Sequence, residues 1–500
     1  GSLPGTHMHI RRLGLARRAF SSVPPFAAAV DDALLTRLER AAHRVTTNAS
    51  ICDRHGDDES HHRSVPPSAV VYAHSTEEVQ AVVRVCAETR TPLISFGAGT
   101  SLEGHIQAVQ GGVCLDLSEM NAVLEVNPED LDCRVQAGTT RKSLNDHLRD
   151  TGLTFPVDPG ADASLGGMAA CGASGTTAVK YGTMRENCLG LTAVLASGEV
   201  VRTGGRARKS SAGYDLTRLL VGSEGTLAVL TEVQLKLYPL PAAVSAATCS
   251  FPTLSDAARA VAGLLQCGVP VSRSELLDAS AIAAFNKYST EVADLQEAPT
   301  LFLEVEGVSE AAVEAAAAVA RECCADSGGG EFQWATSESE RRRLWAARHA
   351  TYYASLALRP GSRGVVTDAV VPLSRLAEVM GETAADVARA GVVGPIFGHA
   401  GDGNFHCILL LRDEDPPDYV ERLSQLNDRL IRRTLAAGGS CTGEHGVGVG
   451  KKQYLAREFG EGAVEMMRTV KRSLDPLGIL NPGKVVDVEA RSSFVKKGDH

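Results

Sequence analysis

The sequence predicts an α+β protein built from two or three packed units. A chain of 500 residues exceeds what a single hydrophobic core usually holds. Residues 69–96 show a βαβ pattern, and residues 243–438 alternate between strand-like and helix-like stretches. Hydrophobic residues at 44% and charged residues at 22% are ordinary for a globular protein.

The first unit opens with the βαβ element. Ala69–Ala73 is strand-like, Ser75-x-x-Glu78 is a capping box, and Pro92–Phe96 gives the second strand. Leucines at helical spacing predict an earlier helix over Asp32–Val45. The elements expected next are the strands Val113–Leu117, Val123–Val126 and Cys133–Ala137, and a helix over Thr140–Asp150 capped by Thr139 or Thr140.

The second unit is expected to be an antiparallel sheet with helices on one face. Its predicted strands are Ala246–Phe251, Leu301–Val305, Val365–Val371 and a strand that leads into residues 399–406. The alanine-rich stretch Ala311–Ala320 is predicted to be a helix packed inside the protein. A third segment follows from residue 440.

Charge and cysteine usage exclude several classes of protein. A net charge of −10 and a pI near 5.8 argue against a nucleic-acid-binding surface. No apolar run approaches the roughly 20 residues that span a bilayer, so we expect no transmembrane segment. The 12 cysteines include no CxxC pair, which indicates reduced thiols rather than a disulfide framework or a zinc finger.

The N-terminus differs in composition from the rest of the chain. Gly1–Met8 resembles an expression-tag remnant. Residues 9–30 contain four arginines and no acidic residue, which is typical of an organelle transit peptide. The mitochondrion is the predicted destination and the plastid is the alternative; a basic N-terminus without a targeting role is the other interpretation.

Two glycine-rich segments predict a dinucleotide site. Residues 97–104 follow a predicted strand, and residues 159–175 consist largely of small residues, for which a flexible linker is the alternative interpretation. Small residues let the backbone approach a ligand, and successive N–H groups bind phosphate oxygens without a lysine. The spacing in residues 97–104 does not match GxGxxG, and Lys452 stands where a Walker A loop needs Ser or Thr. Both NAD and ATP are therefore disfavoured.

A histidine-containing hairpin predicts a metal site. If Asp402-Gly403 forms a two-residue turn, His399 falls directly opposite His406 on one face of the sheet. Glu444, next to His445 in a glycine-rich loop, offers a carboxylate. Two imidazoles and one carboxylate leave open positions at a divalent ion, as in catalytic metal sites. A solvent-exposed hairpin with incidental histidines is the alternative.

Longer motifs carry a family resemblance over about residues 60 to 486. They are Phe96–Gly104, Pro156–Asp162, Gly166–Met168, Tyr181–Thr183, Val221–Leu227, Gly398–His406, Thr442–Gly446 and Asn481–Lys484. The first five resemble the FAD-binding stretches of the vanillyl-alcohol-oxidase-type domain. The last three resemble the C-terminal motifs of FAD-linked D-2-hydroxy-acid dehydrogenases.

The resemblance implies a two-subdomain FAD-binding module of vanillyl-alcohol-oxidase type with an α+β, ferredoxin-like substrate cap. FAD is expected to bind non-covalently between the subdomains, so His105, which follows the first glycine loop, is not expected to bond to the flavin. The expected boundaries are 1–30 for the tag remnant and transit peptide, 31–66 for an N-terminal helical segment, 67–242 for the FAD-binding domain, 243–439 for the cap, 440–486 for a return segment to the FAD domain and 487–500 for a tail.

The resemblance also implies the residues of the site. His399, His406 and Glu444 are the expected metal ligands, for zinc or manganese, and His445 is the expected base. Arg348 is expected to clamp the substrate carboxylate, with a surface helix arginine as the alternative. The expected FAD-binding residues are Gly97, Ala98, Gly99, Thr100, Ser101, Pro159, Gly160, Asp162, Ser164, Gly167, Gly172, Ser174, Tyr181, Gly182, Glu224, Gly225 and Asn481.

The implied reaction is oxidation of D-lactate to pyruvate by hydride transfer to flavin N5. Val366 stands where hydroxyglutarate-type relatives carry a lysine, which favours a monocarboxylate. Glycolate and D-2-hydroxyglutarate are the alternative substrates, and a non-catalytic flavoprotein subunit is the alternative from another class. The expected partners are the small 2-hydroxy acid and an electron acceptor such as cytochrome c or a quinone. The sequence leaves open whether the chain forms a homodimer.

Overall fold

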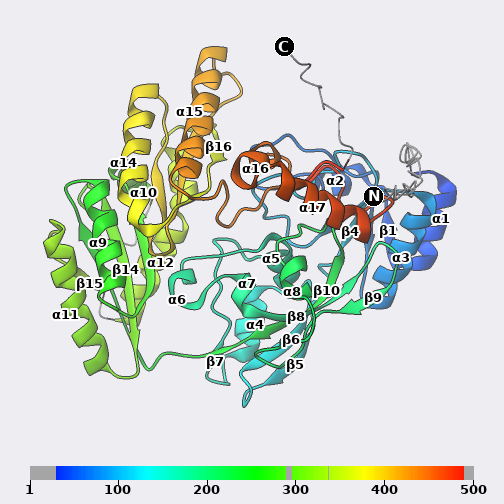
Figure 1. Ribbon diagram of the computed structural model, residues 1–500, viewed down its shortest axis with the longest axis horizontal. Helices are drawn as coiled ribbons and strands as arrows, with labels where there is room; N and C mark the ends of the chain where they lie inside the picture. Colours follow the sequence, from blue (N-terminus) through cyan, green and yellow to red (C-terminus); the bar gives the residue numbers. More distant parts are fainter. Residues whose placement is uncertain (1–29, 289–294, 336, 489–500) are drawn as a thin grey trace, which may run out of the picture.

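The protein forms two lobes, and its C-terminal segment returns from the second lobe to the first (Figure 1). The structure, a computed structural model, describes residues 30–288, 295–335 and 337–488. The first lobe contains two larger sheets, and the second contains one. The predicted tag remnant and transit peptide, up to residue 29, and residues 489–500 of the predicted tail lie outside the described residues.

The first sheet contains the predicted βαβ element. Its order is β1-β2-β4-β3, with β2, β4 and β3 parallel and β1 antiparallel at the edge. The bounds are β1 Arg44–Thr46, β2 Ala69–Tyr72, β3 Leu93–Phe96, β4 Val113–Asp116, α1 Asp32–Ala41, α2 Ala49–Arg54 and α3 Thr76–Thr89. The helix predicted over Asp32–Val45 was too long, because β1 begins at Arg44 and pairs with β2.

Residue spacing explains how α3 packs on this sheet. Its fully buried residues are Val79, Val82, Val83 and Cys86, which follow the spacing of one helical face. The Ser75 side chain accepts a hydrogen bond from the Glu78 backbone N–H at the start of the helix. The Glu78 carboxylate accepts from the backbone N–H of His74 rather than of Ser75, so only one half of the predicted capping box forms.

The second sheet of the first lobe is antiparallel, with the order β5-β6-β10-β8-β9. Its bounds are β5 Val123–Asn127, β6 Asp132–Gln136, β8 Cys188–Val194, β9 Val200–Arg202 and β10 Val229–Lys236. A short ribbon pairs β7 Leu153–Thr154 with β11 Tyr238–Pro239. The helices are α4 Arg141–Leu148, capped by Thr140, α5 Leu165–Cys171, α6 Ala178–Tyr181, α7 Met184–Asn187 and α8 Leu216–Leu220.

The second lobe, which we call the cap, is one antiparallel sheet in the order β15-β12-β14-β13-β18-β19-β16, with β17 paired to β19. Its strands are β12 Ala243–Ser250, β13 Val271–Leu277, β14 Thr300–Gly307, β15 Gln333–Ala335, β16 Arg363–Val366, β17 Ala369–Val370, β18 Ile396–His399 and β19 Asn404–Leu411. Its helices are α9 Leu254–Gln266, α10 Ala279–Tyr288, α11 Glu310–Asp326, α12 Glu338–His349, α13 Thr351–Ala357, α14 Leu373–Ala390 and α15 Pro417–Ala436.

Helices cover both faces of the cap sheet, whereas the sequence predicted one covered face. In β19, Cys407 and Leu409 join the core formed with α9, α11, α14 and α15. Ile408 and Leu410, on the opposite face, join the core formed with α10, α12 and α13. A strand that is buried on both sides is apolar without alternation, which explains the continuous run in this strand.

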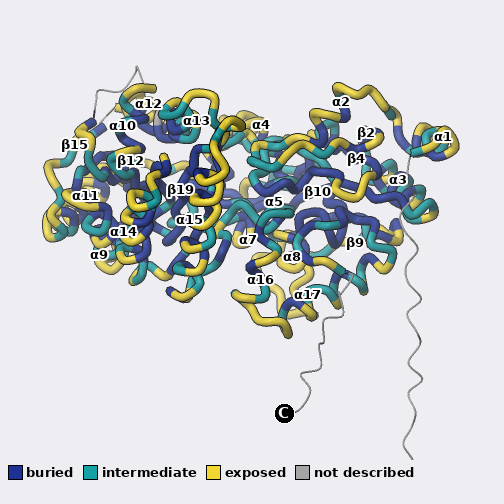
Figure 2. Tube along the Cα trace, turned by 90° about the horizontal axis from the view of Figure 1, so that it is seen from above, coloured by how far each residue is buried: buried dark blue, intermediate teal, exposed yellow. Residues whose placement is uncertain are grey.

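The alanine-rich helix α11 lies at the surface of the cap, so the prediction that it packs inside the protein was wrong. Much of its length is exposed (Figure 2). Its buried residues are Val313, Ala317, Ala320 and Cys324, which form one narrow face. Alanine is compatible with either face of a helix, and this ambiguity misled the sequence interpretation.

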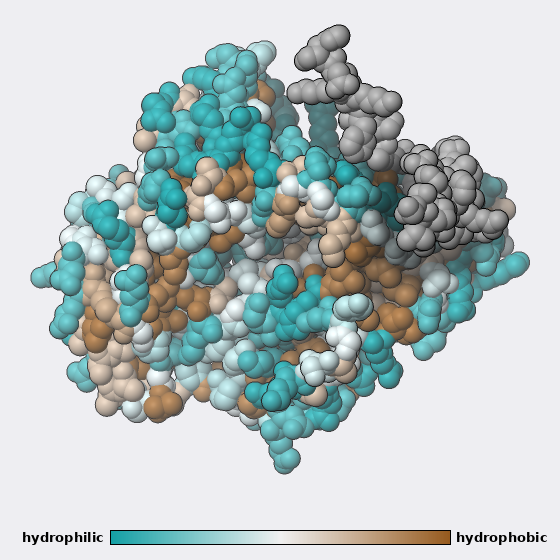
Figure 3. Space-filling view, in the orientation of Figure 1, coloured by the Kyte–Doolittle hydropathy of each residue, from teal (hydrophilic) through white to brown (hydrophobic). Residues whose placement is uncertain are grey.

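The outer ends of the long helices α14 and α15 are hydrophilic (Figure 3). Along the chain that the structure describes, no helix combines the length and the apolar character needed to cross a bilayer.

The return segment packs on the first lobe through α16 Lys452–Phe459, α17 Glu461–Leu474 and the residues that follow. Leu480 forms a parallel bridge with Leu93 of β3. The buried Lys471 amine donates hydrogen bonds to the Thr226 and Leu480 carbonyls and to the Asp475 carboxylate. One buried ion pair therefore joins three segments of the chain.

Replacing Lys471 tests this junction. We expect Lys471→Met to lower the free energy of unfolding by about 3–5 kcal/mol, because Asp475 is left buried without its charged partner. The measurement is the urea unfolding midpoint. The matched control is Lys452→Met, which removes an amine paired with Asp487 near the surface and should change stability by less than about 1 kcal/mol. Equal midpoint shifts in both variants would contradict the assignment.

Candidate active site

A cavity of about 610 Å³ lies where the two lobes and the return segment meet. Cofactor and substrate sites typically occupy roughly 300–1,000 Å³. The first lobe lines the cavity with residues within 95–102, 158–176 and 224–230. The cap and the return segment contribute Arg348, His349, Tyr352, Phe397, His399, His406, Glu444, His445 and Asn481, among others.

The loop after β3 lines this cavity and contains a run of backbone N–H groups without a partner in the described part of the chain. Residues 97–101 line it, and no helix follows directly. The N–H groups of Ala98, Gly99, Thr100 and Ser101 have no hydrogen-bond partner among the described residues. Successive free N–H groups in a loop form an anion cradle. The loop therefore fits the pyrophosphate of a dinucleotide.

Helix α5 and the loop before it supply the facing wall. The Ser164 side chain accepts a hydrogen bond from the Gly167 N–H. A Cβ added at Gly166 would lie 2.5 Å from the Cβ of Ala137, so only glycine permits this contact with the second sheet. Most predicted FAD-binding residues line the cavity: Gly97, Ala98, Gly99, Thr100, Ser101, Pro159, Gly160, Asp162, Ser164, Gly167, Ser174, Glu224, Gly225 and Asn481.

Three predicted FAD-binding residues, Gly172, Tyr181 and Gly182, do not line the cavity. Gly172 and Gly182 end α5 and α6 with φ of 69° and 74°, which is the role of a glycine C-cap. The Tyr181 hydroxyl donates to the carboxylate of Glu306 in β14 at 2.7 Å. Tyr181 therefore hydrogen-bonds to the cap and does not line the cavity.

Glu224 connects the cavity wall to the return segment. Its carboxylate accepts hydrogen bonds from the N–H groups of Val447 and Gly448, and His105 Nε2 lies 3.2 Å from it. Burial opposes ionisation, but the imidazole and the two N–H groups lower the pKa of Glu224 overall. Asn481 donates to the His105 and Glu224 carbonyls, so these residues hold one another at the cavity.

The histidine hairpin forms with a different register from the predicted one. Phe397, not His399, lies opposite His406, because Ala400–Asp402 forms a 3₁₀ turn in place of a two-residue hairpin turn. His399 and Phe397 are two residues apart and share a face, so His399 is a diagonal neighbour of His406. Their ring centroids are 5.6 Å apart.

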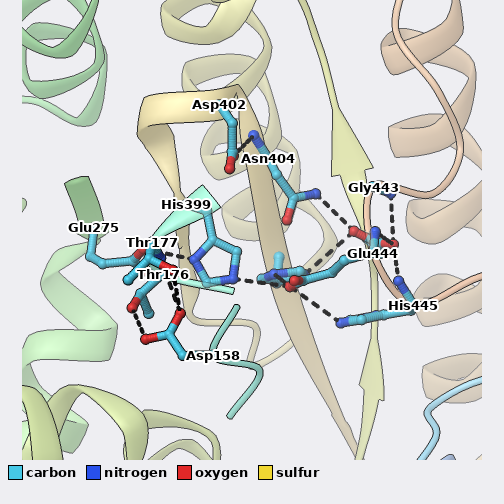
Figure 4. A network of polar contacts seen from close by, with 12 residues as sticks. Asp158, Thr176, Thr177, Glu275, His399, Asp402, Asn404, Gly443, Glu444 and His445 are labelled. Atoms are coloured by element: carbon cyan, nitrogen blue, oxygen red, sulfur yellow. Dashed lines mark hydrogen bonds and ion pairs between the residues drawn. The ribbon is translucent and has the colours of Figure 1, made fainter. Parts of the chain in front are cut away.

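Glu444 reaches from the return segment to His399 (Figure 4) and also contacts His406. Its Oε1 lies 3.0 Å from His399 Nε2 and 3.1 Å from His406 Nε2. The Nδ1 atoms face other acceptors, Glu275 at 2.7 Å and the Thr367 carbonyl at 3.1 Å. The Nε2 atoms of both rings are thereby directed at the carboxylate. Burial opposes the charge, but the two imidazoles hold the pKa of Glu444 well below its usual range.

Arg348 lies buried at the cap side of the cavity, not on the surface. Its guanidinium pairs with Glu275 and lies 4.9 Å from the centre of the Phe397 ring. Within the described part of the chain its Nε has no hydrogen-bond partner. Glu275, which is fully buried, contacts both Arg348 and His399. Glu275 was not predicted from the sequence, because β13 also carries Ser272, Arg273 and Ser274, and one more polar residue does not stand out there.

Asp368 fixes the loop that carries Glu444 and His445. Its Oδ2 accepts hydrogen bonds from the Thr442 hydroxyl and from the N–H groups of Gly443, Glu444 and His445. The strand predicted over Val365–Val371 breaks at Thr367 and Asp368, between β16 and β17. Asp368 lies in this break and was not predicted from the sequence as a residue of the site.

His445 stacks on His406, with ring centroids 4.8 Å apart and planes inclined by 11°. Burial is the main cause that lowers the pKa of His445 to about 3. The imidazole is therefore neutral near pH 7. Its Nε2 lies 3.9 Å from Glu444 Oε1.

Apolar side chains complete the cap end of the cavity. Val366 and Ile408 line it from neighbouring strands, and Tyr352 and Tyr353 line it from α13. Among the described residues no lysine lines the cavity. Asp402 and Asn404 both lie in the turn region of the hairpin, and Asn404 donates to Asp368.

Comparisons with known proteins define the class. The chain matches the FAD binding domain family over residues 67–204 and the C-terminal domain of FAD linked oxidases over residues 240–485. It is similar in structure to 4-ethylphenol oxidase from Gulosibacter chungangensis (TM-score 0.74, 20% identity, 91% of this chain and 96% of that one). It is also similar to p-cresol methylhydroxylase (TM-score 0.71, 18% identity, 92% and 97%). The fold is the vanillyl-alcohol-oxidase type, as predicted.

Relatives in sequence define the family. A probable mitochondrial D-lactate dehydrogenase of Danio rerio is 49% identical over 89% of both chains. A mitochondrial D-lactate dehydrogenase (cytochrome) of Arabidopsis thaliana is 41% identical over 85% of this chain and 75% of its own. A glycolate oxidase subunit of Bacillus subtilis is 33% identical over 86% and 91%. The chain belongs to the FAD-linked oxidase family that contains these proteins, and FAD is the dinucleotide of its binding domain.

A pair of glycine substitutions tests whether the first loop binds FAD. Gly99 (φ +71°) lines the cavity, and a Cβ added there would lie 3.0 Å from the Phe96 ring. A Cβ added at Gly111 (φ +69°) would meet no atom within 4 Å. Alanine at either position adds similar backbone strain. We expect Gly99→Ala to lower the ratio of flavin to protein absorbance and Gly111→Ala to leave it unchanged. Equal losses in both variants would show that strain alone releases the cofactor.

Proposed function

We propose that the protein is a FAD- and divalent-metal-dependent dehydrogenase that oxidises D-lactate to pyruvate. The observation that carries this proposal is the convergence of His399, His406, Glu444, His445 and Arg348 on one end of the FAD cavity. Similarity to proteins named as D-lactate dehydrogenases supports the substrate. A non-catalytic flavoprotein subunit would have no need of a buried cluster of this kind.

His399, His406 and Glu444 would hold the metal ion. Their ligand atoms lie within 4.8 Å of one another. Two imidazoles and one carboxylate suit zinc or manganese, and three protein ligands leave positions for substrate. Glu275 and the Thr367 carbonyl hold the far side of each imidazole, as partners of metal-bound histidines do.

The remaining residues would bind and orient the hydroxy acid. The Arg348 guanidinium is suited to the substrate carboxylate, and its pairing with Glu275 fixes its position. His445 Nε2, on the side of the ligand cluster, would accept the hydroxyl proton, because burial keeps the ring neutral. When bound, the flavin supplies the hydride acceptor at N5 and the divalent ion supplies charge that makes the hydroxyl more acidic.

The relatives and the N-terminal composition support a proposal for the acceptor and the compartment. We propose a mitochondrial location, since the relatives of Danio rerio and Arabidopsis thaliana are named as mitochondrial. The Arabidopsis relative is named for a cytochrome, which supports cytochrome c as the acceptor; a quinone-type acceptor is the alternative. The net charge of −10 favours a basic partner.

The same chemistry on glycolate or D-2-hydroxyglutarate is the alternative function. The Bacillus subtilis relative, named as a glycolate oxidase subunit, favours testing glycolate. The apolar Val366 in the cavity wall disfavours a second carboxylate, because a buried charge without a partner is unfavourable.

Anaerobic flavin reduction tests the function. We expect D-lactate to bleach the flavin of the purified protein, and His445→Gln to slow this step by roughly 10²–10⁴-fold with unchanged flavin and metal content. Removal of metal with EDTA should abolish the reduction, and zinc or manganese should restore it. The control is His147→Gln, at an exposed position in α4. Fast reduction in His445→Gln, or in the metal-free protein, would contradict the proposed mechanism.

Position 366 tests the choice of acid. We expect the natural protein to favour D-lactate over D-2-hydroxyglutarate in kcat/KM, and Val366→Lys to raise kcat/KM for the diacid about tenfold by supplying a charged partner. Val366→Leu, which keeps the wall apolar, should leave the preference unchanged. Equal kcat/KM values for both acids in the natural protein would refute the role of Val366.

A further inference from the structure

Three side chains with metal-ligand chemistry converge at one edge of the first sheet, outside the FAD cavity. His43 lies directly before β1, His74 follows β2, and Glu119 follows β4. These strands are neighbours, and β1 runs antiparallel to β2 while β4 runs parallel to it. The start of β1 and the ends of β2 and β4 therefore meet at the same edge. None of the three residues lines the cavity.

Their donor atoms face a common point. His43 Nε2 lies 2.8 Å and His74 Nε2 lies 2.7 Å from the same oxygen, Glu119 Oε2. The three ligand atoms lie within 4.8 Å of one another. Ligands of a tetrahedral zinc ion with bonds of about 2.0–2.1 Å are roughly 3.3 Å apart, and the centroids of two such imidazoles are roughly 5 Å apart. The ring centroids of His43 and His74 are 3.4 Å apart, so each ring must swing outward by about 0.8 Å to admit the ion. Two imidazoles and a carboxylate are a common zinc donor set.

The Glu78 carboxylate lies beside the second ring nitrogen of His43. Its Oε2 lies 3.5 Å from His43 Nδ1 and accepts a hydrogen bond from the His74 backbone N–H. Glu78 is in the first turn of α3, so its position is fixed by the helix. A carboxylate at the second ring nitrogen is the usual partner of a metal-bound histidine, because it sets the tautomer that directs the other nitrogen at the ion.

Arg44 orients Glu119. It pairs with the other carboxylate oxygen, Oε1, and its guanidinium lies 3.5 Å from the centre of the Tyr72 ring. Glu119 thus keeps Oε2 directed at the two histidines. The positive charge of Arg44 opposes a cation, but the side chains of Arg44 and His74 are 49% and 53% exposed, and solvent screens the repulsion. Water also has access to complete the coordination.

We propose that His43, His74 and Glu119 form a second site, for a divalent transition ion such as Zn²⁺, distinct from the cluster in the FAD cavity. The ion joins the segment before β1 to the ends of β2 and β4. Its role is structural: it fastens the N-terminal segment to the first sheet.

Zinc binding to the FAD-loaded protein tests the site. After removal of metal with EDTA and dialysis, zinc bound per chain is measured by equilibrium dialysis. We expect His74→Ala to bind one zinc fewer than the natural protein, and His147→Ala, at another exposed position, to bind the same number. Glu119→Gln, which retains a hydrogen-bond acceptor, should weaken zinc binding at the site by at least about tenfold. His399→Ala removes a proposed ligand in the cavity, so its zinc content per chain measures the cavity site separately and distinguishes the two sites.

Thermal unfolding supplies a second readout. At zinc concentrations about 100-fold above Kd we expect Tm to rise by roughly 2–5 °C in the natural protein and in His399→Ala. The contribution of this site should be absent in His74→Ala, whose rate with D-lactate should be unchanged. Equal zinc content in His74→Ala and the natural protein, or an equal rise in Tm for both, would overturn the proposal.

Discussion

The candidate active site depends on one buried carboxylate. Asp368 accepts hydrogen bonds at Oδ2 from Thr442 and from three successive N–H groups of the return segment, while its Oδ1 accepts from Asn404 in β19. Burial disfavours its charge, yet the Lys451 ammonium and the hydrogen bond from the Thr442 hydroxyl hold its pKa well below the usual range. A single ionised group thus joins the cap sheet to the loop that carries Glu444 and His445.

The contacts of Asp368 with the cap sheet and the return segment explain why three distant parts of the chain form one site. β18 and β19 bring His399 and His406 to the cap face that carries α12 and α13, and α12 places Arg348 beside them. The return segment, held to the first lobe by Lys471 and Asn481, carries Glu444 across to the cap. The glycine-rich loops expected to bind FAD line the same cavity from the first lobe. The cavity exists only when all three parts are packed together.

Local chemistry made much of this predictable. A loop whose backbone lies close to a ligand needs small residues, so the glycine-rich loops could be recognised from the sequence. Most of the residues predicted in them line the cavity. The metal-ligand types His399, His406 and Glu444 were also recognisable, although the hairpin register was not. A 3₁₀ turn changed that register, and nothing in the Asp-Gly pair distinguishes the two turns. The apolar sequence of β19 and the alanine-rich sequence of α11 were ambiguous. Apolar residues alone do not indicate which face of an element, or how many of its faces, other elements cover.

The sequence by itself determined the α+β class, the glycine-rich loops expected to bind FAD and the residues proposed to bind a metal and a hydroxy acid, because the conformational freedom of glycine and the polar atoms of histidine, glutamate and arginine belong to the residue type. Only the tertiary structure decided which partners those residues meet. It joined Glu275 to His399 and Arg348, turned Tyr181 toward Glu306 and away from the cavity, and brought His43 and His74 to Glu119. The physical reason is that burial, hydrogen bonding and pairing of charges arise between residues far apart in the chain, and only packing brings them into contact.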